Sequence, residues 1–269
     1  MNIIIGKKES KDVFRLFLLL NIFGYREENN SKGMSLFRKK INVKIKNGFL
    51  VDKYEDVKNT IDSHHAWYLI NAIFEKNKNN KKLTEFILKL KEFSLEKDVK
   101  NLEKYFDKYF IDNGKKLLPV FKKEIKKIKK VVNKNVLVKK VIIILNPLDA
   151  YWRGYYVNNK DKVYLILGPG YRDNSYGLLR HEFLHMFISN FKLPKKILEG
   201  KISDELIKQG YGDNKILRDE YVVRALDIIY KTKVLNRDIN KEIKIEEKNN
   251  FNKIRNVVNF VLKQNSVTE

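Results

Sequence analysis

Apolar residues recur every three or four positions along much of the first 135 residues, and this spacing predicts helices. The apolar run over residues 16–23 predicts a buried helix that begins near Asp12, which can cap it, and ends at Gly24. Ser63 is expected to cap another helix. Two more helices are predicted from apolar positions at helical spacing. The first contains Leu83, Phe86, Ile87, Leu90 and Phe93, and the second contains Leu117, Leu118, Phe121, Ile125, Ile128, Val131 and Val132. Pro119 limits where the second helix can begin.

Short β-branched runs replace this pattern after Asn135. Residues 141–145 are a valine and isoleucine run closed by Asn146-Pro147, which predicts a buried strand. Residues 151–157 and 163–167 predict two further strands, and Asn158-Asn159 is expected to turn the chain between them. A small sheet is therefore expected in the middle of the chain.

Helices are predicted again from about residue 173 onward. Asp173, Asn174 or Ser175 is expected to cap a helix that ends before Pro194 and is apolar around most of its circumference, so it must be largely buried. Three more helices are predicted over residues 203–209, from residue 213 or 214 through 230, and over residues 252–263.

The predicted fold class is α+β. A mainly helical N-terminal region over residues 1–135 would be followed, over residues 136–269, by a small mixed sheet, a buried active-site helix and further C-terminal helices, as two regions or one continuous domain.

Composition limits the kind of protein and the kind of metal site. With 269 residues, of which 43% are hydrophobic, the chain can bury a sizeable core, which excludes a disordered protein. It contains no cysteine, so disulfide frameworks, thiolate zinc sites and cysteine nucleophiles are excluded. The apolar run at residues 16–23 is far shorter than a membrane span, and no signal peptide is recognised. We therefore expect no membrane span and a cytoplasmic location.

The formal net charge of +23 raises the question of a polyanionic partner. The excess is almost all lysine along the whole chain, whereas arginine, the better bidentate reader of phosphate, is sparse. The lysines of residues 122–130 fall between apolar positions and are explained as the solvated face of an amphipathic helix. A nucleic-acid partner is therefore an alternative that the sequence does not favour, and no oligomeric state is indicated.

The most specific motif is His181-Glu182-Phe183-Leu184-His185, which uses two of the four histidines of the chain. Histidines at i and i+4 project from the same helix face and can converge on one metal ion. A glutamate directly after the first histidine stands where it can take a proton from a metal-bound water. This spacing is typical of a zinc hydrolase, and the alternative is a chance match on an ordinary helix.

Zinc needs at least three protein ligands and an open position. Glu220 is the expected third ligand, because it lies among apolar residues of a predicted helix, where a carboxylate requires a partner. Arg224, one turn later, is a simpler partner through an i,i+4 ion pair, and both partners can coexist because the carboxylate has two oxygens. His64 and His65 point in divergent directions, so at most one could join the site, and both are expected to be surface or packed helix residues.

The HExxH motif followed by Glu220 on a later helix resembles the zincin metallopeptidases with a glutamate third ligand, the gluzincins, over about residues 140–230. More narrowly, Gly24-Tyr25, Asn146-Pro147-Leu148, the motif at residues 181–185 and residues 220–225 together resemble a family of uncharacterised prokaryotic metallopeptidases over most of the chain.

The resemblance implies that His181, His185 and Glu220 ligate Zn2+ and that Glu182 is the catalytic general base. It also implies that residues 163–167 form an edge strand on which an extended peptide docks; a plain core strand is the alternative.

The sequence departs from the gluzincin pattern at Arg224, where many members carry an aspartate that orients the first histidine. Asp227 or a backbone carbonyl could take that role. Tyr171, Tyr211 and Tyr221 are candidates for an oxyanion stabiliser, and packing is the simpler role for each.

These features together predict a zinc-dependent metallopeptidase, a hydrolase that attacks the carbonyl of a peptide or protein substrate with water activated by Glu182. A non-proteolytic zinc-binding protein with a closed site and a basic nucleic-acid-binding module with a chance motif are the alternatives.

Overall fold

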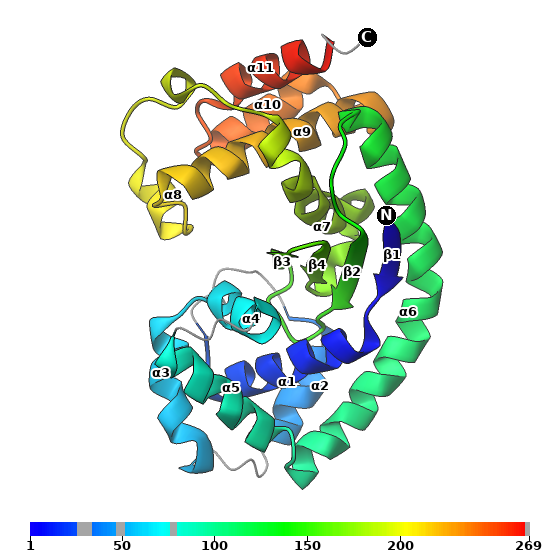
Figure 1. Cartoon of the computed structure of the whole chain (residues 1–269), viewed down its shortest axis with the longest axis vertical. Coiled ribbons are helices and arrows are strands. Elements are labelled where there is room, and N and C mark those ends of the chain that lie inside the picture. The colour runs from blue at the N-terminus through cyan, green and yellow to red at the C-terminus, as the bar shows by residue number, and fades with distance from the viewer. Residues whose placement is uncertain (26–33, 47–51, 76–79, 267–269) are drawn as a thin grey trace. The chain divides into compact units, whose positions relative to one another are not determined.

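The computed structural model describes residues 1–25, 34–46, 52–75 and 80–266, and it confirms an α+β fold that is mainly helical with a small mixed sheet (Figure 1). Within these ranges no helix is both long and apolar enough to cross a membrane. The strands are β1 (Asn2–Ile5), β2 (Lys140–Leu145), β3 (Gly154–Asn159) and β4 (Lys162–Leu167). The α-helices are α1 (Lys7–Phe23), α2 (Leu36–Lys46), α3 (Lys58–Ser63), α4 (Ala66–Glu75), α5 (Lys81–Phe93), α6 (Lys97–Val132), α7 (Asp173–Leu184), α8 (Asp204–Lys208), α9 (Asn214–Leu235), α10 (Ile239–Lys248) and α11 (Ile254–Ser266). Short 3-10 helices are η2 (Asp52–Val57), η3 (Pro169–Arg172), η4 (His185–Asn190) and η5 (Lys195–Ile197).

The chain divides into two compact units. Unit 1 comprises residues 1–121 and 138–179, and unit 2 comprises residues 122–137 and 180–269. This division differs from the expected boundary near residue 135 between regions 1–135 and 136–269. The reason is strand pairing, because β1 at the N-terminus is hydrogen-bonded to β2, which ties the sheet to the N-terminal helices. The later part of α6 belongs instead with the C-terminal helices.

The sheet of unit 1 has the strand order β1-β2-β4-β3. β1 and β4 both pair with β2 in parallel, and β3 pairs with β4 in antiparallel fashion. β4 is therefore an interior strand, so the expected edge strand over residues 163–167 is wrong, and the alternative of a core strand is confirmed. The first strand was not expected from the sequence.

The hairpin between β3 and β4 turns later than expected. Asn158 and Asn159 still pair across the hairpin, Asn159 opposite Lys162, so they belong to β3 and not to the turn. The turn falls at Lys160 and Asp161, and Lys160 takes the positive φ of 56° that the tight connection requires.

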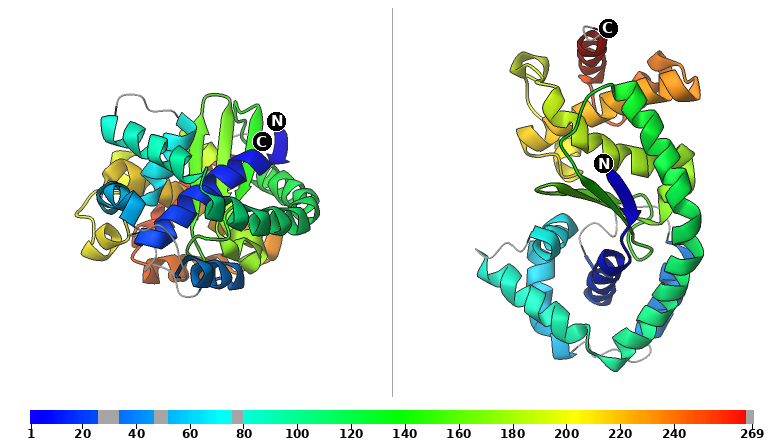
Figure 2. Two further views of the ribbon diagram at one scale, coloured as in Figure 1. Left: turned by 90° about the horizontal axis from the view of Figure 1, so that it is seen from below. Right: turned by 45° about the vertical axis from the view of Figure 1, so that its right-hand side comes forward.

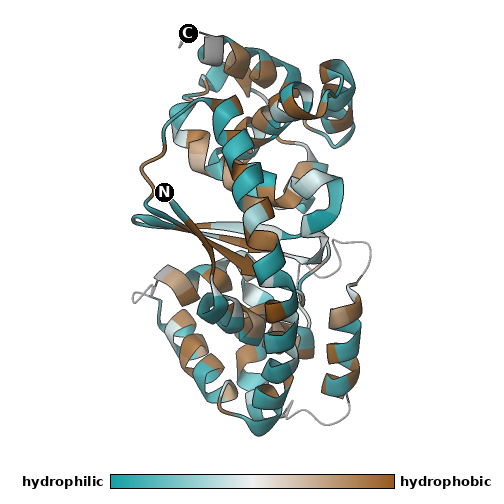
Figure 3. Cartoon of the chain, turned by 90° about the vertical axis from the view of Figure 1, so that its right-hand side faces the viewer, coloured by the Kyte–Doolittle hydropathy of each residue, from teal (hydrophilic) through white to brown (hydrophobic). Residues whose placement is uncertain are grey.

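The two interior strands are buried along almost their whole length, which is why they were recognisable as continuous apolar runs (Figure 3). One face packs on the helices of unit 1, through Ile142, Ile144, Tyr164 and Ile166. α1 and α4 contact the sheet directly, α1 through β2 and α4 through β3 (Figure 2).

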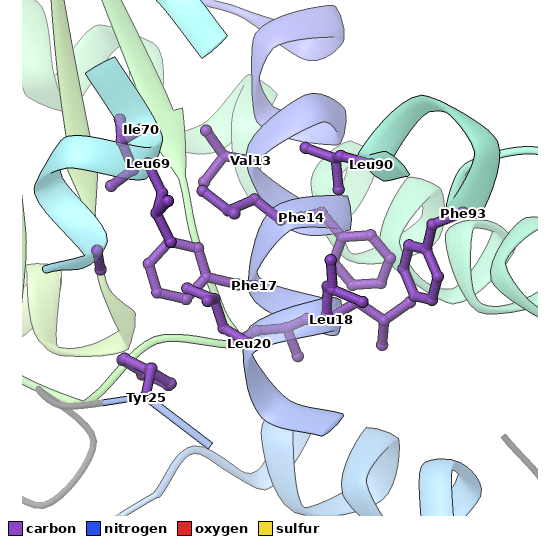
Figure 4. Close-up of a cluster of buried hydrophobic side chains, with 14 of the residues drawn as sticks. Val13, Phe14, Phe17, Leu18, Leu20, Tyr25, Leu69, Ile70, Leu90 and Phe93 are labelled. Carbon is purple, nitrogen blue, oxygen red and sulfur yellow. The ribbon is translucent and has the colours of Figure 1, made fainter. Parts of the chain in front are cut away.

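α1 supplies much of the unit 1 core (Figure 4). Phe14 and Phe17 are fully buried, and Phe14 stacks on Phe106 with 4.7 Å between ring centroids. The helix ends at Gly24, as predicted, with a φ of 79°. Asp12 does not begin it: β1 runs through Gly6 directly into α1, and Asp12 lies inside the helix, where it pairs with Arg15.

Two other sequence-based helix limits are wrong. Ser63 ends α3 rather than capping a new helix, because its hydroxyl donates back to the carbonyls of Asn59 and Thr60. Pro119 lies inside α6, which begins at Lys97. Pro119 and Lys115 are both exposed, so water can satisfy the carbonyl of Lys115 that the proline leaves without a helical partner.

Unit 2 is built around α9, which packs against η4, α10 and α11 (Figure 1). The predicted starts of two helices are confirmed, because Ser203 caps α8 and the Asp213 carboxylate caps α9 through the amides of Lys215 and Ile216. The predicted last helix corresponds to α11, whereas α10 was not expected.

Candidate metal centre

The HExxH motif lies across the end of one helix and the start of a tighter one. His181 and Glu182 are on α7, and His185 begins the 3-10 helix η4. The two histidines remain one turn apart, with ring centroids separated by 5.2 Å. The predicted helix is thus shorter than expected at both ends, since residues 174–176 have left-handed backbone angles and the right-handed turns begin after them.

His181, His185 and Glu220 form the one group of three or more potential metal ligands among the residues that the structure describes. One ligand atom from each residue lies within 4.8 Å of the others. Tetrahedral zinc with nitrogen and oxygen ligands at about 2.0–2.1 Å separates its donors by roughly 3.3 Å. The donors therefore fit a zinc ion after side-chain movements of about 1 Å, and two imidazoles with one carboxylate are a donor set that zinc accepts. The tertiary structure thus brings together the three residues expected from the sequence.

Glu220 divides its two oxygens between two partners. Its Oε2 lies 3.6 Å from His181 Nε2, and its Oε1 lies 2.7 Å from Arg224 Nε, although that N–H does not point along the line of a hydrogen bond. The carboxylate is 5% exposed. Burial alone would raise its pKa, but the charges of His181 and Arg224 outweigh burial and hold the pKa well below its usual range. Glu220 is therefore anionic, as a zinc ligand must be.

The two histidines have opposite electrostatic surroundings. Burial lowers the pKa of His181, but the Glu220 carboxylate outweighs it and raises the pKa to about 9. Burial and the charge of His181 lower the pKa of His185 to about 4. In the metal-free protein at neutral pH, His181 is thus the cation that pairs with Glu220, and His185 is neutral. A zinc ion bound by these residues would displace the extra proton of His181 and become the positive partner of Glu220.

Glu182 is buried, with 5% of its surface exposed, on the same turn as His181. Its negative charge contributes to the raised pKa of His181. The expected general base therefore lies in the same electrostatic environment as the candidate ligands.

Besides the His181–Glu220 contact, a buried ionic network also links α7 to α9. Arg180, whose side chain is 1% exposed, pairs with Asp227 on α9, and its guanidinium lies 4.8 Å from the centroid of the Tyr230 ring. Glu124 on α6 accepts a 2.5 Å hydrogen bond from Tyr230 and lies 3.8 Å from Arg180. Since Arg180 precedes His181 and Asp227 is two turns after Glu220, the Arg180–Asp227 and His181–Glu220 contacts together hold the two helices in register.

Asp227 does not take the role that the sequence suggested for it. Its partners are Arg180 and Lys231, the latter at 2.9 Å, rather than His181. These two cations lower its pKa even though burial would raise it. Arg180 was not identified as important from the sequence, although an arginine directly before the motif on a helix with apolar residues all round was an available signal.

A second network surrounds Arg224, the residue that departs from the gluzincin pattern. Its Nη1 donates to Glu246 Oε2 on α10 at 2.5 Å, and its guanidinium lies over the ring of Phe251 at 4.0 Å from the centroid. Tyr211 is a further hydrogen-bonding partner. Glu246 could not be identified from the sequence because its helix was not predicted.

The tyrosine candidates have packing or hydrogen-bonding roles. Tyr171 is in unit 1, where it packs edge-on against Phe121 and hydrogen-bonds with Tyr109. The Tyr221 hydroxyl accepts from the Lys253 amide at 3.3 Å. Tyr211 hydrogen-bonds with Arg224, which in turn pairs with Glu220.

The other two histidines, His64 and His65, lie between α3 and α4 in unit 1. The imidazole Nδ1 of His64 lies 2.9 Å from the Thr60 carbonyl, and neither histidine belongs to the ligand group.

The sequence matches no protein-family model, and neither curated proteins nor solved structures give a significant match. The functional assignment therefore rests on the motif and on the geometry of the ligand group.

Proposed function

We propose that this protein is a zinc-dependent hydrolase that cleaves peptide bonds. The observation that carries the proposal is the convergence of His181, His185 and Glu220 from separate parts of the chain, with Glu182 on the same turn of helix as the first ligand. A chance HExxH match would not explain why the buried Glu220 carboxylate, some forty residues later in the chain, faces the first histidine.

A catalytic site is a better explanation than a purely structural one. Structural zinc sites are closed by four protein ligands, whereas catalytic sites use three and leave a position for water or substrate. Among the described residues, the group contains three potential ligands and no fourth histidine or acidic residue.

Zinc bound by these residues would lower the pKa of a water molecule and polarise a substrate carbonyl. Glu182 would accept the proton that the water gives up as its oxygen attacks the peptide carbonyl carbon. The same carboxyl would then pass that proton to the amine nitrogen as the C–N bond breaks. Glu220 and the two histidines would hold their ligand atoms in place throughout, and the Arg180–Asp227 pair would maintain the helix register.

The proposal is tested by metal analysis and peptide hydrolysis on the full chain. We expect near-stoichiometric zinc in the wild type and in Glu182→Gln, little zinc in His181→Ala, and full zinc in the matched control His64→Ala. Glu182→Gln should lose at least 100-fold in hydrolysis of a peptide library, since it lacks the proton acceptor. Wild-type protein that binds no zinc would refute the proposal, as would unchanged hydrolysis in Glu182→Gln. Bound zinc with no cleavage of any peptide would favour the closed, non-proteolytic site.

A further inference from the structure

We infer that Arg224 and Glu246 are positioning residues, which together hold Glu220 as a one-oxygen zinc ligand and balance the positive charge beside the metal. The inference rests on the proposed zinc site and assigns a function to two residues outside its ligand group.

The two oxygens of the Glu220 carboxylate face different partners. Arg224 Nε lies 2.7 Å from Oε1, while Oε2 faces His181 Nε2 at 3.6 Å. Oε1 is ion-paired with the guanidinium, so Oε2 is the oxygen that faces the first candidate ligand. Glu220 is therefore oriented to present one oxygen to the ligand group, which leaves room for a water or substrate oxygen.

Several protein groups surround the Arg224 guanidinium. Besides Glu220, it donates to Glu246 at 2.5 Å and hydrogen-bonds with Tyr211, while its guanidinium covers the Phe251 ring. Its side chain is only 20% exposed. Arg224 is thus not arranged to bind a substrate carboxylate.

The charge of Arg224 also affects the candidate metal site. A guanidinium in contact with a ligand carboxylate repels a divalent cation held by that same carboxylate. Glu246 offers its own negative charge to Nη1 of Arg224, whereas Glu220 lies at Nε, so the Glu220–Arg224–Glu246 chain carries one net negative charge. Without Glu246, the positive charge of Arg224 would cancel the negative charge of Glu220. Glu246 therefore increases zinc affinity without touching the metal.

α10 also supplies a matched control. Glu242, one turn before Glu246, is 6% exposed compared with 8% for Glu246. Glu242 pairs with Lys231 of α9 at 3.1 Å, just as Glu246 pairs with Arg224 of α9. The two glutamates thus make equivalent α9–α10 ion pairs, but only the pair of Glu246 continues to a candidate ligand.

The experiment compares Glu246→Gln with Glu242→Gln, using the zinc dissociation constant from competition with a chromophoric chelator. Hydrogen exchange of α9 and α10 in the metal-free proteins measures how much each substitution weakens the helix pair. We expect both variants to lose similar protection, while Glu246→Gln weakens zinc binding by about 10- to 100-fold, as for other residues that support metal ligands. Glu242→Gln should stay within about threefold of the wild type.

Two conservative variants separate charge from geometry. Glu246→Asp keeps the charge and should bind zinc more tightly than Glu246→Gln. Arg224→Lys keeps a cation but cannot bridge two carboxylates with a planar fork, so it should weaken binding by a similar 10- to 100-fold. Zinc affinity of Glu246→Gln within threefold of the wild type, or equal losses in the Glu242 and Glu246 variants, would overturn the inference. A wild type that binds no zinc would instead refute the proposed function.

Discussion

Asp149, which follows strand β2 in unit 1, should make the stability of that unit depend strongly on pH. The carboxyl is 0% exposed. It accepts hydrogen bonds from the Ala150 amide at 2.7 Å, the Tyr25 hydroxyl at 3.0 Å and the Asn146 side-chain amide at 3.2 Å. Burial nevertheless outweighs these bonds and raises its pKa from 3.8 to about 7. Asp149 therefore takes up its proton in the folded state at a pH where the unfolded chain is still ionised.

The sign and size of the effect follow from proton linkage. A carboxyl with a raised folded-state pKa stabilises the folded state fully below the unfolded pKa, and this contribution is lost as the pH rises through the folded pKa. A rise of roughly three pH units, at 1.36 kcal/mol for each, corresponds to about 4 kcal/mol. The loss is expected between about pH 4 and pH 7, with little further change above pH 7.

The test compares the wild type with Asp149→Asn, which keeps the shape and an acceptor oxygen but cannot ionise. Urea unfolding is followed by tryptophan fluorescence, since both tryptophans, Trp67 and Trp152, belong to unit 1. The wild-type free energy of unfolding minus that of the variant should fall by about 4 kcal/mol from pH 4 to pH 8. Substitution of the half-exposed Asp161 by Asn is the matched control for the loss of one carboxylate from unit 1. A difference for Asp149→Asn that varies by less than about 1 kcal/mol over this range would refute the reasoning.

Two further predictions concern unit 2, where hydrogen exchange of α9 is the suitable measurement because the tryptophans are elsewhere. Arg180→Met should destabilise α9 by about 3 kcal/mol, because it removes the buried guanidinium between Asp227 and Glu124 and leaves each carboxylate with a lysine as its remaining cation; a loss below 1 kcal/mol would contradict the assigned network. Zinc at 100 times its dissociation constant should protect α9 by about 2.7 kcal/mol, and Glu220→Gln should abolish this protection; equal protection in that variant would exclude Glu220 as a ligand.

Patterns within a few residues were enough to predict several elements and most of the candidate site. The helix over Leu83–Phe93 and the start of α9 at Asp213 follow from local spacing and from one side chain that caps a nearby amide. The pairing of Glu220 with Arg224 was also predictable, because residues four apart on a helix are neighbours. His181, Glu182 and His185 were recognisable from their spacing alone, because residues four apart on a helix lie on the same face.

Single-residue boundary signals were misleading where other contacts decide the structure. Asp12, Ser63 and Pro119 are each typical of a helix boundary. However, β1 leads directly into α1, and the Ser63 hydroxyl donates to a carbonyl of the preceding turn of α3. α6 continues past Pro119 because its apolar residues are buried on both sides of the proline. The contribution of tertiary packing exceeds the weak preference of one capping residue or the cost of one proline.

The sequence by itself determined the α+β class, the two apolar interior strands and the identity of the three candidate ligands, because each depends on residue type and on spacing along the chain. Only the tertiary structure decided that β4 is interior to the sheet, that Asp227 pairs with Arg180, and that Glu246 pairs with Arg224. The physical reason is that a buried strand or charge must satisfy its hydrogen bonds with some partner, but its own sequence does not specify which one. That choice depends on which distant segments pack together.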